Sequence, residues 1–72
     1  MMWPFRRYPV LREAIVNLKG GETAFRGVVW GRRDGYLVLR NARLLVKGKS
    51  EGTPVDGEVA VPVANVEFVQ VV

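Results

Sequence analysis

The segment 25–45 constrains the fold most, because it contains two apolar runs separated by a short, charged turn. Both runs are rich in Val and Leu, and an aromatic residue lies on each side of the turn. They are too short and too rich in glycine for helices, and they are typical of β-strands. The turn carries Arg32, Arg33 and Asp34 between Gly31 and Gly35, so it is basic and conformationally permissive. The segment therefore predicts a long β-hairpin with a basic tip.

Further strands are predicted on both sides of this hairpin. Ala14, Val16 and Leu18 recur at every second position and so share one face of a strand, and Gly20 and Gly21 can supply the positive φ that a hairpin turn requires. A loop rich in Gly, Ser, Pro and charge follows the hairpin. The predicted strands are residues 10–18, 23–32, 36–46, 58–62 and 66–72, with the loop at 47–57 and a tight turn at 63–65.

The apolar phase slips inside the two longest strands, between Val28 and Val29 and again near Asn41. A slip of this kind indicates a bulge or a sharp bend, as in small closed barrels. Five bent strands that nearly fill residues 10–72 predict an all-β fold, a small and strongly bent antiparallel barrel. Its last two strands would be edges, and apolar edges must be covered or used for pairing. Head-to-tail pairing between identical subunits would close a ring.

Residues 1–9 form a separate arm in this prediction, which mixes three aromatic residues with Arg6 and Arg7. Its prolines leave room for at most one helical turn. The arm could contact nucleic acid or a membrane surface, with aromatics on bases and arginines on phosphates. Alternatively, its aromatic side chains could cover an open end of the core or pack on a neighbouring subunit.

A chain of 72 residues is a single small domain, and such domains bury only about 60% of their unfolded surface. The sequence has no Cys and no His, which excludes disulfides, zinc sites and histidine acid–base chemistry. Oligomerisation is the expected additional source of stability. No apolar run is long enough to span a bilayer and no signal peptide is visible, so a cytoplasmic protein without membrane contact is expected.

The net charge of +4 is unevenly distributed, because all eleven Lys and Arg residues precede Ser50 and every charge after it is acidic. Such a split suits a polyanion at one end, or contact between the basic part of one subunit and the acidic part of the next. The alternative is a solvated surface of mixed charge. Nucleophiles are few and carboxylates scattered, so we expect neither an enzyme nor a cofactor or metal.

Four stretches resemble the two sequence motifs of the Sm family. Residues 16–21, 25–29 and 36–42 resemble the first Sm motif, which pairs a Leu-Lys-x-Gly turn with a strand glycine and a Leu-rich strand. Residues 59–69 look like the second motif and its final strand. The opening Met-Trp-Pro-Phe and the Phe-Arg-Gly-Val-Val-Trp-x-Arg-Arg pattern are similar to small Sm-like proteins of phages that infect actinobacteria.

This resemblance implies a five-stranded Sm barrel that assembles into a ring of six or seven subunits through the fourth and fifth strands. Family rings bind single-stranded, uridine-rich RNA at their pore. The interface would then involve the apolar residues of the last two strands, namely Val59, Val61, Val66, Phe68 and Val69.

The family's uridine pocket is not conserved here. An Arg stands where the motif has Asp, Tyr36 or Leu37 where it has Asn, and Pro62-Val63 where it has Arg-Gly. The same loop offers Arg32 and Arg33 for phosphates and Tyr36 for stacking, a combination that binds bases without reading them. In the alternative interpretation Tyr36 packs in the barrel and the arginines are solvated or pair with Asp34.

Three functions are compatible with these observations. The first is a ring that binds single-stranded nucleic acid, RNA before DNA, weakly and without the uridine pocket. The second is a phage structural or assembly protein that docks a protein partner and binds no nucleic acid. The third is an SH3-like monomer that binds a peptide. If the chain is phage-encoded, the host cytoplasm is the expected location.

Overall fold

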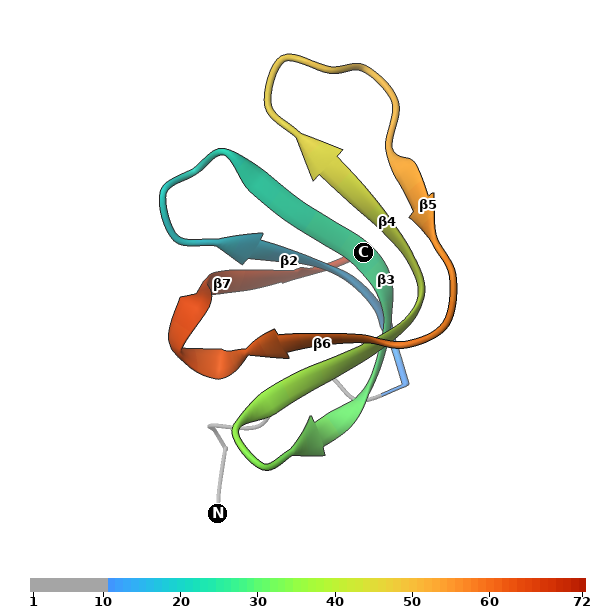
Figure 1. Ribbon diagram of the computed structural model, residues 1–72, viewed down its shortest axis with the longest axis vertical. Coiled ribbons are helices and arrows are strands. Elements are labelled where there is room, and N and C mark those ends of the chain that lie inside the picture. Colours follow the sequence, from blue (N-terminus) through green and yellow to red (C-terminus); the bar gives the residue numbers. More distant parts are fainter. Residues whose placement is uncertain (1–10) are drawn as a thin grey trace.

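The computed structural model describes residues 11–72, so the predicted arm at residues 1–9 lies outside the described residues. Within residues 11–72 the strands form one antiparallel six-stranded sheet, and the only helical element is a single 3₁₀ turn (Figure 1). The elements are β2 (Glu13–Leu18), β3 (Thr23–Arg33), β4 (Tyr36–Val46), β5 (Thr53–Val55), β6 (Val59–Pro62), the 3₁₀ turn η1 (Val63–Asn65) and β7 (Val66–Val71). The predicted all-β class and the bent antiparallel architecture are confirmed.

The sheet follows the order β5-β4-β3-β2-β7, and β6 pairs with the other half of β4. Residues 42–44 of β4 pair with β5, whereas residues 36–39 pair with β6. In Figure 1, β3 and β4 curve upward from their shared hairpin at the bottom of the view, and η1 links β6 to β7 at the left. The strong bend of β4 therefore lets one strand contact both short strands.

The bend in β4 coincides with a change in which residues face the core. Leu37 and Leu39 are fully buried, and the next buried position is Ala42, so the alternation shifts across Arg40 and Asn41. Asn41 has a φ of 53°, a left-handed conformation that Asn tolerates better than most residues. The predicted slip near Asn41 is confirmed.

The neighbouring strand β3 has two irregularities of register, between Arg26 and Val28 and between Val29 and Gly31. They flank the predicted slip. A bulge at such a site increases local bending and twist.

Gly27 lies in the first of these irregularities, and its missing side chain permits close contact with β4. A Cβ at this position would lie 2.9 Å from the carbonyl oxygen of Arg40 and 3.0 Å from Cα of Ala42. Val29, two residues further along β3, is buried. The core therefore sits inside the bend, and its buried apolar members are Ala14, Val16, Val29, Leu37, Leu39, Ala42 and Val61.

Several predicted boundaries are wrong by a few residues. Leu11 has a φ of 63°, which is not a strand conformation, and the first strand begins at Glu13 rather than at residue 10. The hairpin strand continues to Arg33, and the last strand ends at Val71. The loop 47–57 also contains β5, which the Gly- and Pro-rich local sequence does not indicate. Pairing with β4 stabilises this short strand, so tertiary context outweighs local propensity.

Candidate nucleic-acid interface

The β3–β4 connection is a two-residue turn formed by Asp34 and Gly35. Their φ angles are 52° and 80°, and Arg33 pairs directly with Tyr36. Positive φ at both central residues defines the type I′ turn, whose twist matches that of the flanking strands, and Asp-Gly is a preferred sequence for it. Arg32 and Arg33 are therefore strand residues, which corrects the prediction that they belong to the turn.

Their position in a strand places the two arginines on opposite faces, because successive side chains of a strand alternate. Arg32 pairs with Leu37, which is fully buried, and so shares the core-side face of the sheet. Arg33 pairs with Tyr36 on the opposite side, here called the outer face of the β3–β4 ladder. Only Arg33 can act together with Tyr36 on one surface.

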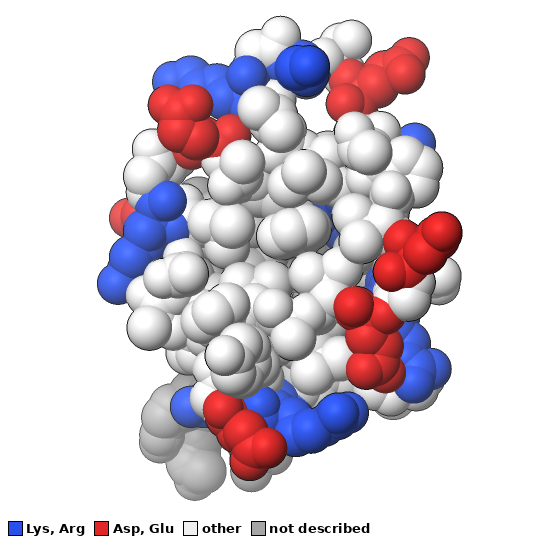
Figure 2. Space-filling view, viewed as in Figure 1, with Lys and Arg blue, Asp and Glu red and all other residues white. Residues whose placement is uncertain are grey.

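The side chains of the tip are exposed. Tyr36 is 45% exposed, so it does not pack in the barrel, and both arginines are exposed as well. Among residues 11–72 the ion pairs are Arg26–Glu13 and Arg40–Glu58, and neither involves Asp34. Figure 2 shows basic atoms on both sides of an acidic group at the lower end of the molecule, where Figure 1 places the hairpin. Within residues 11–72, no ion pair engages the two guanidinium groups of the tip, which lie beside an accessible phenol ring.

The turn η1 lies directly beside this tip. The backbone N–H of Val63 donates to the carbonyl oxygen of Gly35 at 2.9 Å, and Pro62 pairs with Tyr36 in the β4–β6 register. The positions that carry Arg-Gly in the second Sm motif thus do reach the tip. Here Pro62 and Val63 contribute an apolar surface with no side-chain hydrogen-bond donor.

Two strand edges are free within the described chain. β5 and β6 each pair only with β4 and together form one edge, and β7 pairs only with β2 and forms the other. Of the residues expected at a subunit interface, Phe68 is 53% exposed, while Val59, Val66 and Val69 are partly buried against the core. Val61 is 3% exposed and belongs to the core of the barrel itself, so its side chain is not accessible to a neighbour.

A cluster on the outer face was not anticipated from the sequence. Trp30 is 43% exposed, and the Cζ atom of Arg40 lies 4.0 Å from the centre of its ring. Arg40 in turn donates from Nε and Nη2 to Oε2 of Glu58, at 3.1 and 2.9 Å. A tryptophan in an apolar strand run suggests core, and only the register of β3 and β4 shows that it points outward.

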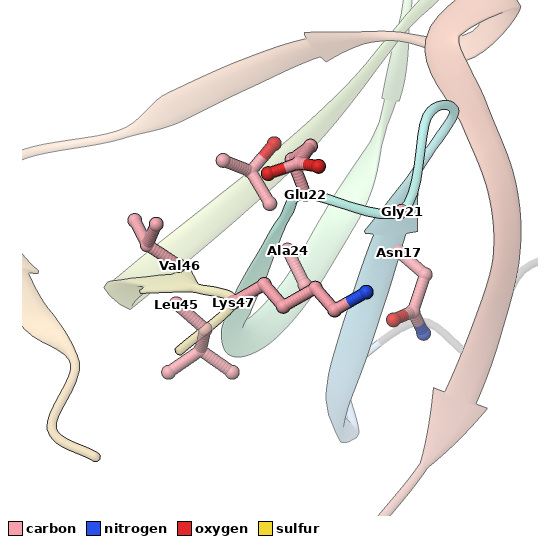
Figure 3. A pocket seen from close by; sticks show the side chains of 8 residues that line it. Asn17, Gly21, Glu22, Ala24, Leu45, Val46 and Lys47 are labelled. Carbon is pink, nitrogen blue, oxygen red and sulfur yellow. The ribbon is translucent and has the colours of Figure 1, made fainter. Parts of the chain in front are cut away.

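A shallow pocket of about 210 Å³ lies at the other end of β3, between the β2–β3 turn and the end of β4. In Figure 3 the side chain of Lys47 extends toward Asn17 across the strand that carries Ala24, and Glu22 lies above them. A carboxylate and an ammonium group share this pocket, so their charges offset each other. It is a weaker candidate for a polyanion than the tip.

Within residues 11–72 no three carboxylate, imidazole or thiol side chains gather closely enough to hold a metal ion. No helix in the same range has the length and apolar character needed to cross a membrane.

No protein-family model and no curated protein matches the sequence. Solved structures do match. The Pyrococcus abyssii Sm protein in complex with a uridine heptamer has 23% identity and a TM-score of 0.72, over 88% of this chain and 86% of that one. The P. aerophilum SmAP1 heptamer has 22% identity and a TM-score of 0.68, over 88% and 81% of the two chains. A chain of the NatC complex bound to CoA has 19% identity and a TM-score of 0.68, over 88% and 78%.

These likenesses extend over nearly all of the described chain and define its fold. The protein has the Sm fold, in which the fourth strand of the barrel is here divided into β5 and β6. The function must be argued from the tip and the free edges, because a shared fold does not by itself establish a shared activity.

Proposed function

We propose that this protein is a binding protein rather than an enzyme, and that it assembles with copies of itself into a ring. In this proposal the free edge of β6 in one subunit pairs with the free edge of β7 in the next, and six or seven subunits close the ring. The ring binds single-stranded nucleic acid, RNA before DNA, at the tip, where Arg33 and Tyr36 contact the strand and Arg32 adds positive charge from the opposite face. Binding is weak and does not depend on uridine.

The observation that carries this proposal is the exposed Tyr36, which lies beside Arg33 and next to η1 at one end of the barrel. A flat aromatic ring can stack on any base, and guanidinium groups can hold phosphates. No side-chain amide or guanidinium group comes from Pro62 or Val63 to read a base edge. Chemistry of this kind supports binding without a sequence code.

Assembly is supported by the two free edges and by the composition of β7. Phe68 and Val71 are 53% and 47% exposed, an arrangement that an isolated β-strand edge rarely tolerates. Among solved structures with this fold, one is a heptamer and another is a complex with a uridine heptamer. Repeating two tip arginines around a ring would also create a strongly positive rim, which adds to the attraction for phosphates.

The test is a titration of the protein into labelled single strands of uridine-rich RNA, adenine-rich RNA and DNA of equal length. We expect binding at about 50 mM salt that falls steeply toward about 200 mM and differs little between the two RNAs. The double variant Arg33→Ala/Tyr36→Ala should lose binding, whereas Lys49→Ala, which removes a cation from the distant 47–52 loop, should not. Undetectable binding at low salt, or equal binding by the double variant, would overturn the proposal.

A protein-docking module is the second candidate, and one comparison favours it. The same fold occurs in a chain of the NatC complex, a multi-subunit assembly. Under this alternative the apolar edge of β7 docks a protein partner, and the phage origin suggested by the opening residues would make that partner a phage or host protein in the host cytoplasm. A partner that remains bound after a high-salt wash, together with no affinity for oligonucleotides, would favour docking over the ring.

A further inference from the structure

The outer face of the β3–β4 ladder contains a second exposed aromatic residue, Trp30, in addition to Tyr36 at the tip. Starting at the turn, its successive positions are the pair Arg33–Tyr36, the pair Gly31–Val38, and then Trp30 stacked with Arg40. Buried Leu37 and Leu39 alternate with Tyr36, Val38 and Arg40 along β4, although Val38 is itself only 4% exposed. Trp30 lies in the register irregularity between Val29 and Gly31, and its contact with Arg40 places it on the same face as Arg40. Both exposed aromatic residues of the hairpin therefore share one face.

Trp30 is held in a defined orientation on this face. Arg40 covers part of the indole at 4.0 Å, and Glu58 fixes Arg40 through two hydrogen bonds to one carboxylate oxygen. The indole nevertheless remains 43% exposed. A shallow depression of about 300 Å³ adjoins this cluster, lined by Arg40, Asn41, Gly57 and Glu58. A pre-positioned aromatic ring loses little conformational freedom when a base stacks on it.

Gly31 places no side chain between the two aromatic residues. A Cβ on Gly31 would meet no atom of residues 11–72 within 4 Å, while Gly31 itself is half-buried and its partner Val38 is 4% exposed. Trp30 and Arg33 lie three residues apart on β3, with Trp30 in the register irregularity between Val29 and Gly31.

From this arrangement we propose that Trp30 is a second stacking position for single-stranded nucleic acid. A nucleic-acid strand bound at the tip continues over Gly31, and one of its bases stacks on the indole of Trp30. The inference rests on the proposed function, because it extends the site formed by Arg33 and Tyr36. Arg32 points to the opposite face of the ladder and is not part of this track.

The test uses the intrinsic fluorescence of Trp30. The sequence contains two tryptophans, so a Trp3→Phe protein retains Trp30 as its single indole. We expect a single-stranded oligonucleotide to quench this fluorescence at concentrations that match binding measured with a labelled strand. Trp30→Ala should weaken binding about tenfold or more, in the range seen for a lost base-stacking residue, and Trp30→Phe should restore most of the affinity.

Gly31→Val provides a second variant that leaves both aromatic residues in place. The valine side chain would project between Tyr36 and Trp30. A β-branched residue is favoured in a strand, so the fold should tolerate the substitution. We expect it to reduce the affinity for long strands while strands of two or three nucleotides bind as before.

The outcomes separate the two proposals. If the oligonucleotide binds and Arg33→Ala/Tyr36→Ala abolishes binding, but Trp30 fluorescence and Trp30→Ala affinity are unchanged, the second stacking position is wrong and the tip remains. If no strand binds, the proposed function fails and the track fails with it.

Discussion

Arg33 and Tyr36 are directly paired at the last position of the β3–β4 ladder and share its outer face, whereas Arg32 shares the opposite face with buried Leu37. Two adjacent arginines at one turn therefore differ in what they can contact. The difference follows from the two-residue turn, since a longer turn would have left both arginines free to point in the same direction.

We predict that Arg33→Ala and Arg32→Ala have unequal effects on nucleic-acid binding. Arg33→Ala removes the cation beside the stacking ring and should weaken binding several-fold, with a smaller dependence on salt. Arg32→Ala should change the affinity less, although it removes the same charge. Fluorescence anisotropy with a labelled strand at two salt concentrations measures both effects. Equal losses would show that the strand does not follow the face of Tyr36.

Asp34→Asn is predicted to strengthen binding without loss of stability. The substitution removes a negative charge that lies next to the tip arginines and repels the phosphates of the nucleic acid. Asn-Gly also suits the type I′ turn that Asp34 and Gly35 form. We expect a few-fold gain in affinity at low salt that disappears at high salt. Glu51→Gln removes the same charge from the distant loop and serves as the control. A similar gain for both variants would indicate a general charge effect rather than one local to the tip.

Gly27→Ala is predicted to destabilise the barrel. The added Cβ would lie 2.9 Å from the carbonyl oxygen of Arg40, so β3 and β4 must separate, at a cost of about 1–3 kcal/mol. Gly31→Ala is the matched control, because its Cβ meets nothing within 4 Å, and it should change stability by less than about 0.5 kcal/mol. Urea unfolding of both variants gives the comparison. Equal midpoints would contradict the close packing at Gly27.

Much of the fold could be predicted because the decisive signals are local. The alternation of Ala14, Val16 and Leu18 matches their burial, and the paired glycines at 20 and 21 do have positive φ, at 96° and 72°. The slip near Asn41 is readable because a strand has a strict period of two, and any departure from it must appear as a bend.

The rest depended on register, which local patterns do not contain. Arg40 meets Trp30 and Glu58 only because β3, β4 and the segment before β6 are aligned as they are. The strand β5 likewise exists only through its pairing with β4. The turn between β3 and β4 and its basic character could therefore be predicted, while the unequal orientation of its arginines and the outward Trp30 could not.

Phe68→Asp is predicted to prevent assembly while the barrel stays folded. A charge on the exposed edge strand β7 would have to be buried between subunits, which is unfavourable. Leu11→Asn is the control, because it removes an even more exposed apolar side chain, at 64%, from a residue outside β6 and β7, and Asn suits the positive φ there. Circular dichroism checks the fold, and light scattering checks the size. A ring that persists in Phe68→Asp would mean that β7 is not in the interface.

The most direct test of the central claim is native mass spectrometry of the purified protein with and without a short single-stranded RNA. The account predicts a closed assembly of six or seven copies of the 8.1 kDa chain that gains the mass of the bound strand and loses it in the Arg33→Ala/Tyr36→Ala variant. A single 8.1 kDa species that retains no strand would contradict both the ring and its nucleic-acid site.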